Sequence, residues 1–159
     1  MAGLDETAVK AVYAALMSHA KKLGLFPHTS DHEPLSPPPG GSISFALIEG
    51  PIGPAPSGLA ATSVSWHWLM RLYSPWLEKP ASGIDPKLTA AVVKLLGSYA
   101  LDLDLTAFGA PEGLIREIDV LGPASTPKWL EQDGKPFRIR EIDIALIVND
   151  AYVQGVGGG

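Results

Sequence analysis

The sequence contains no cysteine and few charged residues, and both absences narrow its possible chemistry. Without cysteine there are no disulfides, no thiolate metal ligands and no cysteine nucleophile. Charged residues make up only 18% of the 159 residues, with a net charge of −5 and no run of Lys or Arg. The chain therefore lacks the basic surface with which proteins neutralise nucleic-acid phosphates. It also lacks any apolar stretch approaching the roughly 20 residues that span a bilayer.

Apolar residues, glycine and proline are abundant instead. Hydrophobic residues make up 46% of the chain, beside 17 Gly and 15 Pro. A chain this apolar is not intrinsically disordered, and its length suits one domain with a buried core. We expect residues 1–154 to form that domain with long loops, and residues 155–159 (GVGGG) to form a flexible tail. The N-terminus has no positive region leading into an apolar one, so no secretory signal is expected.

Two segments have the spacing of amphipathic helices. Residues 5–23 place apolar side chains at i, i+3 and i+4, with Asp5 suited to cap the start and Gly24 suited to end the helix. A second helix is predicted to begin at Asp85 and Pro86, with Asp85 as N-cap and Pro86 as first helical residue. Its expected buried stripe is Leu88, Ala91, Val92, Leu95 and Tyr99.

Alternation of apolar and polar residues predicts strands over 42–49, 59–73 and 113–121. In the second of these, one face carries Val64, Trp66, Trp68, Met70 and Leu72. The segments 26–41 and 50–58 are rich in proline and glycine and are predicted to be loops.

A hairpin is predicted near the C-terminus, because Asp133-Gly134 separates residues 129–132 from a long strand that starts at Pro136. Phe137 and Ile139 have the opposite parity to the later apolar residues of that strand, so we expect a bulge near 140–141. The order α-β-β-α-β-β predicts an α+β fold, a two-layer sandwich of two helices on a mainly antiparallel sheet.

One cluster of ligand-type side chains stands out in the sequence, namely His28, Asp31 and His32. It falls in a predicted loop beside prolines without a further ligand, so we expect a solvated loop rather than a metal site. His67 is expected to be a half-exposed strand residue, because no nucleophile is predicted beside it.

The other candidates also have plain structural interpretations. Trp66 and Trp68 suit a core face better than a platform for bases or sugars. The strand carboxylates suit solvated faces or salt bridges between subunits better than an acid/base pair; they are Glu117, Asp119, Glu141 and Asp143. The sequence therefore predicts no catalytic, cofactor-binding or metal-binding residue, no cofactor and no enzyme.

Two segments and the order of elements carry a resemblance to a known family. The segments are VSWHWLMRLYSP, residues 64–75, and FRIREIDIALIVNDAY, residues 137–152. Together with the helix–strand–strand order they resemble the tail terminator proteins of long-tailed (siphovirus-type) phages, especially those infecting actinobacteria. The resemblance covers most of the chain but includes no catalytic motif.

The resemblance implies a structural protein of the virion, located at the head-proximal end of the tail after assembly in the host cytoplasm. Such a protein forms a ring, typically a hexamer, which caps the tail tube and joins it to the head neck. Its partners are then its own copies, the major tail tube protein and a head-completion or neck protein. DNA would pass through the ring without sequence-specific contact, which an acidic chain permits because it does not grip phosphates. No membrane partner is implied.

Two other interpretations remain open at this point. One is another neck or tail-completion protein of a phage. The other is a small α+β hydrolase or metal enzyme that uses His28, Asp31 and His32, which the metal content of the purified protein would distinguish.

Candidate contact residues follow from the predicted exposure of the 128–141 hairpin and the 50–58 loop. Trp129 is the expected apolar anchor of an interface, Asp133 lies at the predicted turn, and Arg138 and Arg140 are the expected polar contacts.

Overall fold

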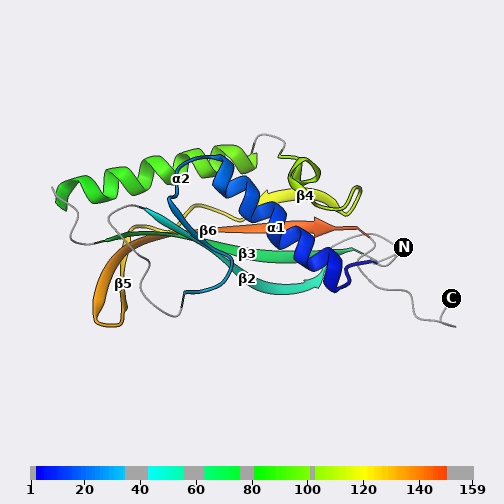
Figure 1. The fold of residues 1–159 in the computed structure, drawn as a ribbon, viewed down its shortest axis with the longest axis horizontal. Helices are drawn as coiled ribbons and strands as arrows, with labels where there is room; N and C mark the ends of the chain where they lie inside the picture. Colours follow the sequence, from blue (N-terminus) through cyan, green and yellow to red (C-terminus); the bar gives the residue numbers. More distant parts are fainter. Residues whose placement is uncertain (1–2, 35–42, 56–62, 76–80, 101–102, 150–159) are drawn as a thin grey trace, which may run out of the picture.

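The structure, a computed structural model, places two helices on one face of a six-stranded mixed sheet (Figure 1). It describes residues 3–34, 43–55, 63–75, 81–100 and 103–149. The expected α+β fold with two helices is confirmed. The elements are α1 (Glu6–Lys22), β1 (His28–Ser30), β2 (Ser44–Pro54), β3 (Val64–Pro75), η1 (Ala81–Gly83), α2 (Ile84–Ala100), η2 (Leu105–Phe108), β4 (Ile115–Val120), β5 (Lys128–Gln132) and β6 (Lys135–Val148).

The strands lie in the order β1-β2-β3-β6-β4, and β5 also pairs with β6. All the pairs are antiparallel except β1 with β2, which is parallel. β1 lies within the segment 26–41 that was predicted to be a loop, so that prediction is wrong for residues 28–30. β4 pairs with the C-terminal half of β6 and β5 with its N-terminal half. These two short strands therefore follow one another along the same edge of β6.

The helix ends follow local signals only in part. The Asp5 carboxylate accepts a hydrogen bond from the backbone N–H of Ala8 at 2.9 Å, and Gly24 follows α1 with φ +69°, as expected for a cap and a stop. The start of α2 differs from the prediction. The helix begins at Ile84, directly after η1, so Asp85 lies inside the first turn and is not the N-cap. Pro86 is tolerated there because the first N–H groups of a helix have no intrahelical acceptor.

The main core lies between the sheet and the two helices. The predicted tryptophan face of β3 points into it, and Trp66 and Trp68 are only 2% and 1% exposed. Tyr13 of α1 meets Trp68 edge-on, with ring centroids 4.8 Å apart. The predicted stripe of α2 is buried in the same cluster. This confirms the two tryptophans as core residues.

A second, smaller cluster lies on the opposite face of the sheet. Phe137 and Ile139 pack there against Tyr73 and Ala46. The register between β3 and β6 runs without interruption from Val64↔Val148 to Pro75↔Phe137. The bulge predicted near Arg140–Glu141 is therefore wrong. Phe137 and Ile139 have the opposite parity because they point to the other face of the sheet. There they form this second cluster with residues of β2 and β3.

The segment 50–58 was also predicted to be a loop, but β2 continues to Pro54. A register shift between Glu49 and Ile52 accommodates the extra residues. Gly50 lies at this irregularity, where an added Cβ would come 3.0 Å from the His67 carbonyl oxygen. Residues 56–62 lie outside the described part of the chain, as do the proline-rich residues 35–42 and the predicted tail at 155–159.

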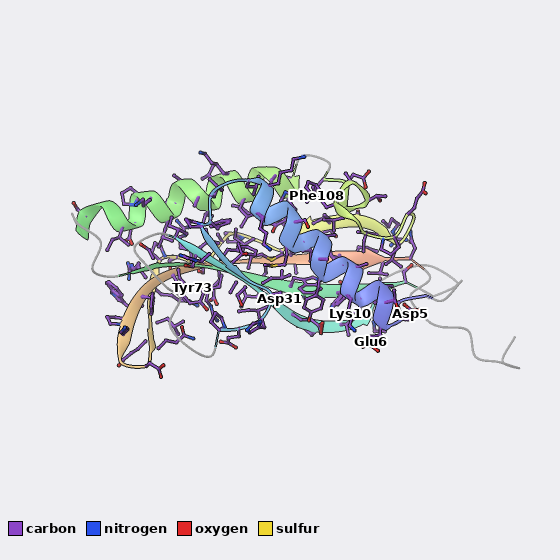
Figure 2. All side chains as sticks on the ribbon, in the orientation of Figure 1. Asp5, Glu6, Lys10, Asp31, Tyr73 and Phe108 are labelled. Carbon is purple, nitrogen blue, oxygen red and sulfur yellow. The ribbon has the colours of Figure 1, made fainter. Side chains whose placement is uncertain are left out.

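His19 is a buried polar residue that the sequence analysis did not single out. It is 4% exposed, with its ring 5.3 Å from that of Tyr99 on α2 and 5.4 Å from that of Phe108 on η2. Figure 2 shows Phe108 near the C-terminal end of α1. Nδ1 of His19 has no hydrogen-bond partner among the described residues. Burial therefore lowers the pKa of His19 below its ordinary value.

This lowered pKa predicts a pH-dependent stability. Above about pH 6.5 His19 is neutral in both the folded and the unfolded chain. As the pH falls below that value, the unfolded chain takes up the proton first, so the free energy of unfolding decreases. Urea denaturation at pH 7.5 and pH 5.5 should show this decrease in the wild type and a smaller one in His19→Leu. Equal decreases in both proteins would contradict the assignment to His19.

Candidate assembly surface

The β5–β6 hairpin is a well-defined projection from the sheet. Asp133 and Gly134 have φ values of +50° and +72°, as a two-residue type I′ turn requires. The predicted turn is therefore confirmed, and Asp133 is exposed at its tip. Figure 1 shows the hairpin curving away from the sheet on the side opposite the helices. Trp129 on β5 is 58% exposed, in agreement with the predicted exposure of that side chain.

Arg138 fixes the hairpin to α2. Its Nε and Nη2 atoms donate to the two carboxylate oxygens of Asp85 at 2.9 and 3.1 Å. The hydrogen bonds from Arg138 hold the pKa of Asp85 below its ordinary value. The same guanidinium lies 4.9 Å from the centre of the Trp129 ring. Arg138 thus contacts one face of the Trp129 ring and, through Asp85, connects the hairpin to the start of α2.

Arg140 makes a second connection one step further along β6. Its Nε donates to the Ser125 carbonyl oxygen at 2.9 Å, and its Nη1 donates to the Thr89 hydroxyl at 2.8 Å. Both arginines expected at an interface are therefore engaged within their own chain. Any contact that they make with a partner remains a prediction. Within the chain, their side chains connect β6 to α2 and to Ser125.

A charged network crosses the sheet face opposite the helices. Arg71 donates to Glu141 at 2.8 Å, to Glu33 at 3.1 Å and to the Tyr73 hydroxyl at 3.1 Å. Lys128 of β5 contacts the other carboxylate oxygen of Glu141. Arg71 and Glu141 are each only 12% exposed. The network links the segment after β1 to β3, β6 and β5.

The pKa values within this network follow from two opposing effects. Burial lowers the pKa of Arg71, but its hydrogen bonds with Tyr73 and Glu141 outweigh burial and raise it. Burial likewise raises the pKa of Glu141, but Lys128 and Arg71 outweigh it and lower that pKa. Both groups are therefore charged at neutral pH.

The histidine cluster weighed in the sequence forms a short exposed segment. His28 begins β1, and Nδ1 of His32 lies 2.9 Å from a carboxylate oxygen of Asp31. Over the described ranges, no three His, Asp or Glu side chains are grouped so that they could hold a metal ion. His67 is half-buried on β3, as predicted. Of the four strand carboxylates, Glu141 belongs to the charged network, while Glu117, Asp119 and Asp143 are exposed.

A groove of about 690 Å³ lies between β4 and the C-terminal end of α2. All six residues of β4 line it, together with Tyr99 and Leu103. Its charged lining consists of three carboxylates and one basic side chain, namely Asp104, Glu117, Asp119 and Arg116. No pattern in the sequence predicts this groove, because its walls come from segments that only the fold brings together.

Comparisons with known proteins identify no family for this chain. No family model matches it, and no curated protein matches its sequence. Among the described residues, no helix is both long and apolar enough to cross a membrane.

Proposed function

We propose that this chain is a structural assembly protein, a tail terminator that forms a ring on the end of a phage tail tube and joins the tail to the head. The observation that carries the proposal is the braced hairpin. An exposed tryptophan stands on a projecting strand whose base is fixed to α2 by the Arg138–Asp85 pair. The resemblance of segments 64–75 and 137–152 to tail terminators supports the same function.

The geometry of the hairpin suits a protein that binds other proteins. An exposed aromatic residue held by a cation–π contact loses little conformational freedom on binding, so more of its contact energy is available for association. Aromatic anchors of this kind carry much of the energy of protein–protein interfaces. The described residues offer this surface, and they contain no group of three or more His, Asp or Glu side chains that could hold a metal ion.

The physical role also explains the expected phenotype. A tail tube grows by adding subunits to its exposed end, and growth stops only when a different surface covers that end. A phage from which this coding sequence is deleted should therefore accumulate filled heads, with unjoined tails of excessive and uneven length. Electron micrographs that show uniform tails attached to heads would overturn the proposal.

A matched pair of variants connects this phenotype to the hairpin. Complementation with Trp129→Ala should leave many tails long and unjoined, whereas Val93→Ala should restore normal virions. Val93 is the right control because it is also an exposed apolar residue, 61% exposed, but lies on α2. Stoichiometric zinc in the purified protein, measured by elemental analysis, would instead favour a metal enzyme.

A further inference from the structure

Within the described residues, the sheet has outer strands on both sides. β1 ends the row on one side, while β4 and β5 are the outer strands on the other side, and each of these two pairs with β6 alone. An unpaired strand edge exposes backbone N–H and C=O groups that can pair with another chain. β4 and β5 follow each other along one edge of β6, so they cannot pair with each other within one subunit.

The outward backbone groups of β4 can be assigned from its hydrogen bonds. The Leu121 N–H donates to the Asp143 carbonyl at 2.8 Å, so Leu121 has its backbone groups turned towards β6. Antiparallel neighbours alternate between bonded and non-bonded pairs. The backbone groups of Asp119 and Glu117 therefore also face β6, and those of Ile118 and Val120 point away from β6 along the free edge.

The same alternation applies to β5. The two-residue turn makes Gln132 and Lys135 a bonded pair, so Leu130 is bonded to β6 as well. The backbone groups of Trp129 and Glu131 then point outwards. β4 has six residues and β5 has five, so the two free edges match in length.

Exposed apolar side chains and charged side chains both lie along these two edges, as expected of a surface that binds another chain. Within the described residues, four large apolar side chains are exposed, and two of them, Leu121 and Trp129, lie beside β4 and on β5. The groove along β4 has three carboxylates and one basic residue. Of the three basic residues in 128–138, Lys128 and Arg138 are already paired with Glu141 and Asp85, which leaves Lys135 as the basic side chain that can meet the carboxylates of the groove.

We infer that the free edge of β4 in one subunit pairs with the free edge of β5 in the next subunit, with the hairpin seated against the groove. Two copies of β4 would instead bring the carboxylates of two grooves together, which is unfavourable. A contact between two different surfaces of the same chain is heterologous, and its repetition forms a ring when the rotation between neighbouring subunits closes. The inference rests on the proposed function only in that both require such a ring.

The test uses proline to block each edge without breaking the pairing to β6. In Ile118→Pro and Glu131→Pro the lost N–H points outwards, so each edge strand tolerates the change, and Trp129 is left in place. Light scattering should give a ring of more than two copies for the wild type and a 16.8 kDa monomer for each variant. Ile118→Val and Glu131→Ala keep the N–H and should form the wild-type ring.

Mixing the two proline variants gives the decisive result. Each retains the edge that the other lacks, so an equimolar mixture should form a one-to-one dimer, while neither variant forms one alone. A wild-type ring in Ile118→Pro, a monomeric or dimeric wild type, or a mixture of folded variants that stays monomeric would overturn the inference.

Charge reversal provides a second route if a proline variant does not fold. Glu117→Lys with Asp119→Lys, and separately Lys135→Glu, should each weaken association by about tenfold or more, and mixing the two proteins should recover it. Unchanged association in both would overturn the inference. The two proposals can fail separately. If the protein forms rings through these edges but the deletion phage has normal tails, the strand pairing is supported and the tail terminator function is wrong.

Discussion

Replacing Trp68 with alanine is expected to lower the free energy of unfolding by about 3–5 kcal/mol. Trp68 lies in the middle of β3, is 1% exposed, and contacts the rings of Tyr13 and Trp66. Its Nε1 has no hydrogen-bond partner among the described residues, so the loss consists of apolar burial and packing. Because domains are stable by only about 5–15 kcal/mol, the variant should be close to unfolding at moderate temperature.

Urea denaturation of the wild type and Trp68→Ala measures this difference. Trp129→Ala is the matched control, because the same residue type is removed from an exposed position with a cation–π contact. Its expected cost is about 1 kcal/mol or less. If Trp68→Ala were as stable as Trp129→Ala, Trp68 would not be part of the core.

The main core could be predicted because its signal is local. The period of two along 64–72 and the helical spacing along 88–99 each identify one apolar face. The two faces pack against each other because this removes the apolar side chains of both from water. Asp133-Gly134 likewise predicted the hairpin turn, because positive φ at two successive positions depends on those residues alone.

The errors arise where tertiary contacts decide the structure. β1 has three residues, too few to show a period, and it is a strand only because β2 lies beside it in parallel. The bulge was inferred from the parity of Phe137 and Ile139 on the assumption of one core. In the structure both residues are buried in the second cluster around Tyr73, and the register between β3 and β6 does not shift.

The contacts between the hairpin and α2 could not be predicted from the sequence either. Arg138 and Asp85 are 53 positions apart, and only the packing of α2 over β6 brings them together. Asp85 was interpreted as a cap because Asp before Pro is a strong local signal. In the structure the Asp85 carboxylate pairs with Arg138 instead of capping the helix. The ion pair with a residue distant in sequence therefore decides its role, and the local capping signal does not.

Arg71→Met is expected to lower the free energy of unfolding by about 2–3 kcal/mol, although Arg71 lies outside both hydrophobic clusters. Its guanidinium holds Glu141, Glu33 and Tyr73 together across the sheet face opposite the helices. Without it, the largely buried Glu141 carboxylate keeps Lys128 as its one charged partner among the described residues. The cost arises mainly from this poorly compensated charge rather than from lost attraction.

A double-mutant cycle with Glu141→Gln separates that cost from packing. The double variant should be more stable than the two single losses predict, with a coupling of about 1–2 kcal/mol. Lys10→Met is the control, because Lys10 and Glu6 form an exposed pair at 75% and 83% exposure, seen on α1 in Figure 2. Its expected cost is about 0.5 kcal/mol or less.

Acid denaturation gives an independent measurement of the same network. The pKa of Glu141 is lower in the folded chain than its ordinary value of 4.5, so its contribution is complete above that pH and is lost as the pH falls below it. The wild type should therefore lose more stability between pH 5 and pH 3 than Glu141→Gln, which has no carboxylate to protonate there. Equal losses in the two proteins, or strictly additive effects in the cycle, would show that Arg71 stabilises the sheet through packing alone.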